Sequence, residues 1–344
     1  MLTLYSGDHL GHDVGVEFNR GRLTAAFERP ERAEKVLAAI RAAGIGPVGS
    51  PAESSLDTVL RVHRRDYVEF LSGAHAEWRA LDREGDAVPL AWPIRGLRSD
   101  RIPASLDGRL SYYSFDVSSP IAAGTWKAAR SAAAVASTGA ARVAQGRERA
   151  AFGLCRPPGH HAASDYYGGY CFLNNAAIAA QHFRDSGAAR VAILDVDYHH
   201  GNGTQEIFYE RPDVLFASIH ADPASDFPYF LGYADETGAG AGAGFNRNYP
   251  LKRGADWAIW SEALEAACGA VAAYGPDALV VSLGVDTFRK DPISHFDLES
   301  EDFLRIGERI ARLKMPTLFL MEGGYAVEEI GNNVVNVLAG YQDQ

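Results

Sequence analysis

Cysteine is scarce in this sequence of 344 residues. The three cysteines, Cys155, Cys171 and Cys268, lie far apart, and none belongs to a CxxC pair. Their odd number and their spacing support neither a disulfide framework nor a zinc site built from thiolates. Free thiols suit a reducing compartment, so we expect a cytoplasmic protein.

Long hydrophobic runs and an excess of positive charge are also missing. No segment approaches the roughly 18 consecutive apolar residues needed to cross a bilayer. Asp and Glu number 44 against 33 Lys and Arg, which gives a net charge of −11. A chain this acidic is unsuited to general binding of nucleic acids or anionic membranes, and it attracts cationic partners more readily. We therefore expect no nucleic-acid partner and no membrane partner.

The sequence does contain a regular alternation of short apolar runs and longer amphipathic stretches. The apolar runs predict buried strands, because both faces are apolar, at residues 2–5, 150–154, 191–196, 214–219, 278–283 and 317–321. The spacing between them predicts helices at residues 30–43, 126–145, 175–186, 256–274, 301–313 and 328–339. Consecutive parallel strands need crossover connections, so this order predicts an α/β fold with one parallel sheet flanked by helices.

No repeat or linker divides the chain, so we expect a single domain over residues 1–344. One segment stands out, at residues 84–120, where prolines and turn residues are frequent. It is too long for an ordinary connection in a compact domain, and loops of this length usually have a function.

Unusual polar residues come directly after four of the predicted strands. Ligands bind beyond the carboxyl ends of parallel strands, so these residues should converge on one place. They are His160 and His161 in RPPGHH; Asp195, Asp197, His199 and Asn202 in DVDYHHGNG; Asp286 in GVD; and Tyr325 in EGGY.

Asp197, His199 and Asp286 have the chemistry of a metal site. Residues two apart in an extended segment project to the same face, so Asp197 and His199 can reach one ion, and Asp286 supplies a third ligand from another strand end. Three protein ligands leave one position of a tetrahedral zinc ion open, as in catalytic sites. The alternative is that these residues are solvated loop residues or caps.

The tandem histidines suit proton transfer rather than metal binding, because adjacent residues in an extended strand face opposite ways. Imidazole can accept and return a proton near neutral pH. Asp195 and Asn202 are the nearest candidates to orient such a histidine. Tyr325, after two glycines, can direct its hydroxyl at a developing oxyanion. Simple packing remains the alternative for each residue.

Several motifs, in order along the chain, resemble those of the histone deacetylase superfamily: RPPGHH, GGYCFLNN, ILDVDYHHGNGTQEIFY, SLGVDTF and EGGY. The wording DVDYHHGNGTQ, the opening YSGDH and the long segment before Thr125 are most similar to its bacterial acetylpolyamine amidohydrolases, also called polyamine deacetylases. Several long motifs in order are a specific signal.

The resemblance implies the arginase-deacetylase fold, with a central parallel sheet of about eight strands. It also implies one Zn²⁺ per chain on Asp197, His199 and Asp286, although iron or cobalt fits the same ligands. The other roles that it implies are a general base and acid at His161, an electrostatic partner at His160, supporting residues at Asp195 and Asn202, and a transition-state donor at Tyr325.

Two further features follow from the resemblance. A structural K⁺ or Na⁺ is implied at Asp195, Asp197, His199, Ser218 and the backbone of Ile219. The arginase branch of the same fold uses two manganese ions and needs extra carboxylates, but Gly201 and Gly284 stand at those positions here. This disfavours guanidine hydrolysis.

The resemblance also points to the substrate, a small cationic acetylated amine such as acetylputrescine, acetylcadaverine or a longer acetylpolyamine. The substrate-binding positions would be Gly169, Tyr170 and Phe227 along a narrow channel. Glu17 is the first choice for the partner of the distal ammonium and Asp116 the second. In such enzymes the segment near residues 84–120 narrows the entrance and packs across a homodimer.

Two other functions remain open at this stage. One is a deacetylase that acts on acetyl-lysine in proteins, which a restricted entrance would disfavour. The other is a non-catalytic binder of acetylated amines, which would tolerate the loss of His161 or Tyr325, yet both residues are present.

Overall fold

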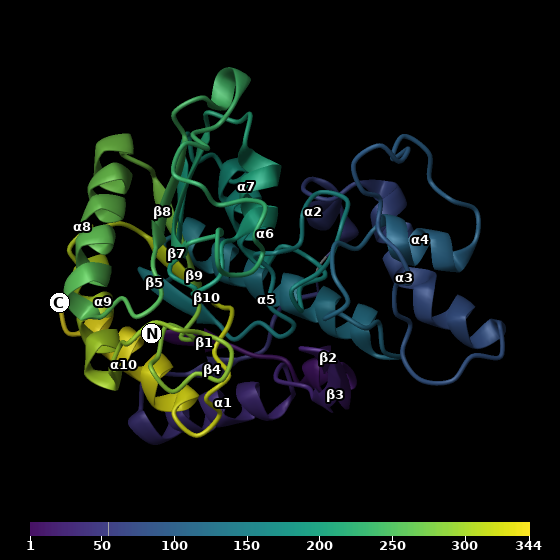
Figure 1. Cartoon of the computed structure of the whole chain (residues 1–344). Helices are drawn as coiled ribbons and strands as arrows, with labels where there is room; N and C mark the ends of the chain where they lie inside the picture. Colours follow the sequence, from purple (N-terminus) through teal and green to yellow (C-terminus); the bar gives the residue numbers. More distant parts are fainter. Residues whose placement is uncertain (54) are drawn as a thin grey trace.

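The computed structural model describes residues 1–53 and 55–344. Its centre is an eight-stranded sheet with the order β4-β1-β5-β10-β9-β6-β7-β8, in which all paired neighbours are parallel (Figure 1). The strands are β1 (Leu2–Leu4), β4 (Val48–Gly49), β5 (Ala150–Gly153), β6 (Val191–Asp195), β7 (Val214–Ala221), β8 (Asn246–Leu251), β9 (Ala278–Leu283) and β10 (Thr317–Met321). A separate antiparallel hairpin joins β2 (Val16–Asn19) to β3 (Arg22–Ala25).

Helices cover both faces of the sheet. They are α1 (Glu31–Ala43), α2 (Leu56–Leu60), α3 (Arg65–Ala80), α4 (Leu106–Tyr112), α5 (Thr125–Ala144), α6 (Asn175–Asp185), α7 (Asn202–Phe208), α8 (Trp257–Tyr274), α9 (Ser300–Ala311) and α10 (Ile330–Gln342). Two short 3₁₀ helices, η1 (Gly7–Gly11) and η2 (Gly240–Gly242), lie in connections. The alternation of strand and helix confirms the predicted α/β class.

The hydrophobic core has two layers, one on each side of the sheet. Along β6, Ala192 and Leu194 pack with α1, α8, α9 and α10, whereas Val191 and Ile193 pack with α3, α4, α5 and α6. This division follows from the pleat, which sends successive side chains to opposite faces. Both faces are dry, which explains why the strands are apolar without alternation.

The six predicted strands and six predicted helices are all present, with ends that agree within a few residues. The sequence reading missed β4 and β8, the two edge strands of the sheet. β4 has only two residues, and β8 reads NRNYPL, in which polar residues and Pro250 hide the strand pattern. Proline is tolerated on an edge strand because one side of the backbone needs no partner.

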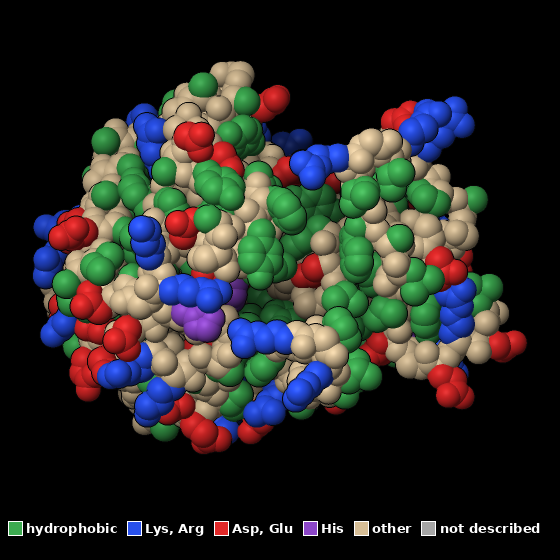
Figure 2. All heavy atoms as spheres, in the orientation of Figure 1, with side chains coloured by type: hydrophobic (Ala, Val, Ile, Leu, Met, Phe, Trp, Pro, Cys, Tyr) green, Lys and Arg blue, Asp and Glu red, His purple; other side chains and the backbone are tan. Residues whose placement is uncertain are grey.

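The segment around residues 84–120 is partly helical rather than one long loop. It contains α4, and a bridge between Ala87 and Ile121 closes its base. With α3 it forms a lobe beside the main body, and Figure 2 shows apolar side chains along the hollow between the two (Figure 1, Figure 2). Several large apolar side chains of this segment are exposed: Leu90, Ile94, Leu97 and Ile102.

Two findings bear on the expected compartment. Cys155, Cys171 and Cys268 are buried and unpaired. Among the residues that the structure describes, no helix combines the length and the apolar character needed to span a bilayer.

Candidate active site

The polar residues predicted from the strand ends meet at the carboxyl edge of the sheet. β5, β10, β9 and β6 are neighbours in that order, so the segments that follow them start side by side. The pairing of β6 with β9 places Asp195 opposite Ser282, which brings the DVDYHH and GVD segments together. The topology therefore explains why residues nearly ninety positions apart share one site.

Asp197, His199 and Asp286 form a compact buried group. The Nδ1 atom of His199 lies 3.0 Å from Oδ2 of Asp286 and 3.4 Å from Oδ1 of Asp197. Ligands of a tetrahedral zinc ion with bonds of about 2.0–2.1 Å lie roughly 3.3 Å apart, so both distances suit such an ion. Ligand atoms of all three residues lie within 4.8 Å of one another. In the described part of the chain, neither carboxylate lies within ion-pair distance of a Lys or Arg.

The remaining oxygens of the two carboxylates are held by backbone amides. Gly323 N donates to Oδ2 of Asp197 over 2.8 Å, and Tyr198 N donates to Oδ1 of Asp286 over 2.8 Å. A Cβ atom at Gly284 would approach Oδ2 of Asp197 to 2.1 Å, and one at Gly323 to 2.5 Å. The two glycines thus let the backbone approach Asp197 closely, and backbone amides hold both carboxylates in place, which fits a set of anionic ligands for a divalent cation.

The two histidines have opposite electrostatic environments. Burial alone would lower the pKa of His160, but the carboxylates of Asp195 and Asp197 outweigh it and raise the pKa to about 10. Nδ1 of His160 lies 2.9 Å from Oδ2 of Asp195. Burial, together with the positive charge of His160, lowers the pKa of His161 well below its usual value. Near neutral pH His160 is therefore charged and His161 is neutral.

His161 is oriented to accept a proton. Its Nδ1 atom lies 2.7 Å from Oδ1 of Asn202, which is an acceptor, so Nδ1 carries the proton and Nε2 is free. Asn202 begins α7. Gly169, with φ of 55°, lies so close that a Cβ atom there would meet Cδ2 of His161 at 2.3 Å. The close approach of this turn to the imidazole therefore requires glycine.

Tyr325 follows β10 on a loop held from two sides. Its backbone N–H donates to Oδ2 of Asp291 over 2.7 Å. From α1, the guanidinium of Arg32 lies 4.6 Å from the centre of the Tyr325 ring, and its Nε donates to the carbonyl of Gly324 over 2.6 Å. Burial raises the pKa of Tyr325 well above its usual value, so the phenol stays protonated and can donate.

Aromatic rings lie beside His161 and Tyr325, at the approach to the group of Asp197, His199 and Asp286. Phe227 contacts the His161 ring edge-on at 5.2 Å, and Tyr170 lies 5.7 Å from Tyr325, measured between ring centres. Phe115, which the sequence reading did not identify, stacks on Phe227 at 5.6 Å. The segment around residues 84–120 therefore contributes a ring to the wall.

The two candidate ammonium partners have different surroundings. Glu17, on β2, accepts a hydrogen bond from the Tyr170 hydroxyl over 3.1 Å, and burial raises its pKa. Asp116 instead accepts bonds from Gly169 N over 2.8 Å and from the hydroxyl and amide of Ser118. These contacts give Asp116 a part in holding the Gly169–Tyr170 turn, whereas Glu17 adjoins the wall of the approach.

The residues expected around a monovalent cation are neighbours in the sheet. Asp195 on β6 lies opposite Ser218 on β7, and Ile219 follows it, all fully buried. Oδ1 of Asp195 also accepts a bond from Asp197 N over 3.1 Å.

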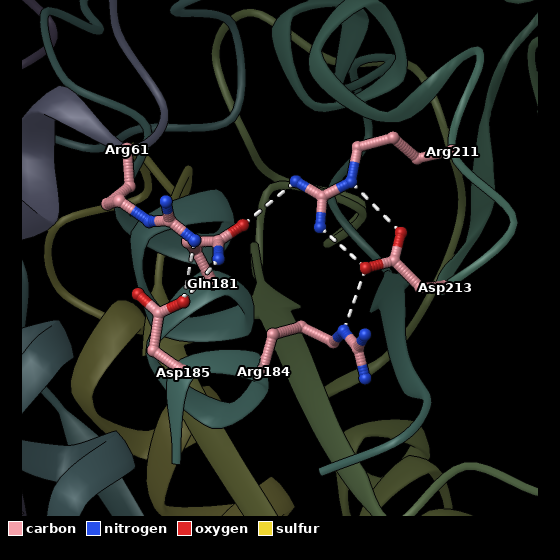
Figure 3. A pocket seen from close by; sticks show the side chains of 6 residues that line it. All are labelled: Arg61, Gln181, Arg184, Asp185, Arg211 and Asp213. Carbon is pink, nitrogen blue, oxygen red and sulfur yellow. Dashed lines mark hydrogen bonds and ion pairs between the residues drawn. The ribbon is translucent and has the colours of Figure 1, made fainter. Parts of the chain in front are cut away.

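A second polar group lines a cavity of about 440 Å³ near the opposite, amino edge of the sheet (Figure 3). Asp213, directly before β7, accepts bonds from Nε of Arg184 and Nη2 of Arg211, each over 2.7 Å. Arg61 pairs with Asp185 over 2.9 Å. Each carboxylate here is neutralised by a guanidinium, so this cavity lacks the free ligands of the carboxyl edge.

Known proteins are similar to this chain in both fold and sequence. A model of the histone deacetylase domain matches residues 26–341. Acetylpolyamine amidohydrolase 2 of Pseudomonas aeruginosa is 59% identical over 342 residues, which cover 99% of each chain, and acetylpolyamine amidohydrolase of Mycoplana ramosa is 52% identical over 340 residues with the same coverage. The crystal structure of acetylpolyamine aminohydrolase from Burkholderia pseudomallei matches with a TM-score of 0.94 at 41% identity, covering 99% of this chain and 98% of the other. The chain therefore belongs to the histone deacetylase family.

Proposed function

We propose that this protein is a zinc-dependent acetylpolyamine amidohydrolase, which converts acetylated diamines and polyamines to acetate and the free amine. The carrying observation is the group of Asp197, His199 and Asp286 beside a neutral histidine at the end of an aromatic-lined approach. The similarity to acetylpolyamine amidohydrolases over nearly the whole chain supports this choice of substrate.

The proposed chemistry divides between the ion and the side chains. When bound at these three residues, a divalent ion polarises the acetyl carbonyl and lowers the pKa of water from about 15.7 towards 7. His161 takes a proton from the attacking water at Nε2 and returns it to the departing amine. His160, charged and held by Asp195, stabilises the negative charge nearby, and the Tyr325 hydroxyl donates to the oxyanion that develops on the acetyl oxygen.

Glu17 is the proposed partner of the ammonium group at the distal end of the substrate. A diamine carries an ammonium group at the end of an unbranched chain, and a carboxylate is its natural partner. Glu17 contacts Tyr170 from the side of the β2–β3 hairpin, which suits this role. Glu17→Gln should raise KM for N-acetylputrescine by about tenfold, since one charged hydrogen bond is worth roughly 1.5 kcal/mol or more. An uncharged N-alkylacetamide of equal length, used as a control substrate, should show no such change.

A homodimer through the segment around residues 84–120 is part of the proposal. Leu90 is 73% exposed and Ile94 is 68% exposed. Neighbouring apolar side chains exposed to this extent are unfavourable in water and are typical of a surface that a partner covers. A second copy of this chain is the proposed partner, with the segment also narrowing the entrance. Leu90→Glu with Ile94→Glu should yield a monomer in sedimentation equilibrium, and a dimer that persists would contradict this interface.

The decisive experiment compares four substrates side by side: N-acetylputrescine, N-acetylcadaverine, N-acetylspermidine and an acetyl-lysine peptide. The proposal requires acetate release from the small amines, loss of activity on metal removal, and recovery on addition of Zn²⁺. A protein that hydrolyses only the peptide would instead be a protein deacetylase. Binding without turnover of all four would indicate a non-catalytic binder.

A further inference from the structure

We propose that Glu322 is a positioning residue that holds the loop of His160 and His161 in register with the loop of Tyr325. This role rests on the proposed function, because it concerns the geometry of the same reaction. Glu322 does not contact the substrate path in the scheme above, and no part of that scheme uses it.

The side chain of Glu322 reaches from one strand end to the next. Glu322 is the first residue after β10 and is fully buried. Its Oε2 atom accepts bonds from Gly159 N over 2.6 Å and from His160 N over 3.2 Å. Its Oε1 atom lies 3.4 Å from the Ser282 hydroxyl, near the end of β9. One carboxyl group therefore contacts the ends of two neighbouring segments.

The backbone of the same residue starts the loop of Tyr325. Its N–H donates to the carbonyl of Leu283 over 2.9 Å, and its carbonyl accepts from Nη2 of Arg32 over 2.6 Å. Arg32 also holds Gly324, one residue before Tyr325. The backbone of Glu322 is thus fixed to the Tyr325 side of the site, and its carboxyl group to the histidine side.

The histidine loop depends on this acceptor. Gly159 and His160 are buried, and a buried amide without a partner is costly. The loop has little room to move elsewhere, because a Cβ atom at Gly159 would already meet Asn175 N at 2.4 Å. Removing the acceptor should therefore displace the backbone that carries both histidines.

A hydrogen-bond acceptor, rather than a negative charge, is what this position needs. Burial raises the pKa of Glu322 to about 7, even though charged His160 nearby lowers it. The two amides require an oxygen at the right distance, and the amide oxygen of glutamine supplies one. Glu322→Gln keeps the acceptor without the charge, Glu322→Asp keeps the charge but shortens the reach, and Glu322→Ala removes both.

The kinetic test compares these three variants on N-acetylputrescine with metal content matched to the wild type. Glu322→Ala and Glu322→Asp should lose about 30-fold or more in kcat with KM within about threefold, because a shift of 1 Å in a reacting group can cost about 100-fold. Glu322→Gln should stay within about threefold of the wild type by the same reasoning, since it retains the acceptor. Equal losses in Glu322→Gln and Glu322→Asp would overturn the positioning role.

Hydrogen exchange reads the same contacts without any turnover. Pro157 and Pro158 have no amide hydrogen, so a peptide covering residues 157–161 reports only Gly159, His160 and His161. This peptide should exchange faster in Glu322→Asp than in the wild type, and Glu322→Gln should match the wild type. Unchanged exchange in Glu322→Asp overturns the inference, and this holds even if the wild type hydrolyses no acetylated amine. That last result would count against the proposed function alone.

Asp302 provides the matched control. It is also a buried carboxylate, but it accepts a bond from Glu299 N over 2.9 Å at the start of α9 and pairs with Arg305. Asp302→Asn should lower the melting temperature while kcat and the exchange of residues 157–161 stay at wild-type values. Equal effects on kcat in this variant and in Glu322→Ala would show a general loss of stability and overturn the specific role.

Discussion

Carboxylates have opposite surroundings at the two ends of the parallel strands, which we call the amino edge and the carboxyl edge of the sheet. At the amino edge, Asp213 is a quarter exposed and pairs with two guanidinium groups, which lower its pKa to about 2 (Figure 3). At the carboxyl edge, Asp197 and Asp286 are fully buried and contact only histidine and backbone amides. Charge at the first edge is neutralised by guanidinium groups, whereas the second edge has three buried carboxylates, Asp195, Asp197 and Asp286, for one charged histidine, His160, and keeps a net negative charge.

This difference shows how to recognise a functional group of charges. A partly exposed ion pair contributes about 0–1 kcal/mol, so the amino edge needs no function to account for it. Buried carboxylates that outnumber their cationic partners are costly, and they persist where something outside the chain supplies further positive charge. The cavity lined by paired charges is therefore less informative than the group of buried carboxylates that have no Lys or Arg partner.

Removing one ligand should give the largest contrast between the edges. Asp286→Asn should lose bound metal and at least about 100-fold in kcat/KM, because it takes one of three ligands from the ion. Asp213→Asn should keep activity within twofold and lose only about 0.5–1 kcal/mol of stability. Metal analysis, kinetics and urea unfolding measure these effects. Full metal content in Asp286→Asn would contradict the assigned site.

Tyrosine at each edge allows a second comparison. Tyr325→Phe should lower kcat by about 10²–10³ with little change in KM, since one oxyanion donor is removed. Tyr274 at the amino edge donates to the carbonyl of Pro212 over 2.8 Å. Tyr274→Phe should cost about 1 kcal/mol of stability and leave kcat unchanged. Undiminished activity in Tyr325→Phe would remove its role as donor.

A third group of charges, around Glu28, shows how pairing with arginine changes the pKa of a fully buried carboxylate. Glu28 is buried like Asp197 and Asp286, the proposed metal ligands, but it pairs with Arg32 and Arg156 over 2.8 Å each. Burial alone would raise its pKa, and the two arginines, with Arg156 first, lower it to about 2. Since this is below the ordinary 4.5, Glu28 stabilises the fold above pH 4.5, and this contribution is lost as the pH falls towards 2.

Glu28→Gln should therefore be less stable than the wild type by about 3 kcal/mol at pH 7. The gap between the two proteins should narrow as the pH falls from 4.5 towards 2, because the wild type then protonates Glu28 and loses the same interaction. Urea unfolding at pH 7, 4 and 3 measures the gap. A gap of constant size would mean that the carboxylate charge does not carry the effect.

Strand-end residues could be predicted from the sequence because each follows an apolar run that is easy to see. His160, Asp197 and Asp286 were found in this way, and the sheet order then brought them together. Glu322 ends the same kind of run, in EGGY, and the same rule would have found it.

Other residues that shape the site are not marked by any pattern in the sequence around them. Arg32 donates to the carbonyl of Gly324, which lies 292 positions away in the sequence, and Asp291 accepts from the backbone amide of Tyr325. Every residue has a carbonyl and nearly every residue has an amide, so the residue types do not show which backbone groups are bound. Phe115 lies in an irregular segment where no periodicity indicates which ring faces the site. Asp116 was placed near the substrate ammonium by resemblance, but its contacts depend on the fold of the Gly169–Tyr170 turn, which the sequence pattern does not specify.

The order of the strands has a consequence for synthesis of the protein. β9 and β10 lie between β5 and β6, although they are made more than eighty residues after β6. A ribosome that has released β5 and β6 has not yet released the strands that separate them in the finished sheet. A chain cut short before β10 therefore lacks Tyr325 and the strand that joins β5 to β9 in the sheet.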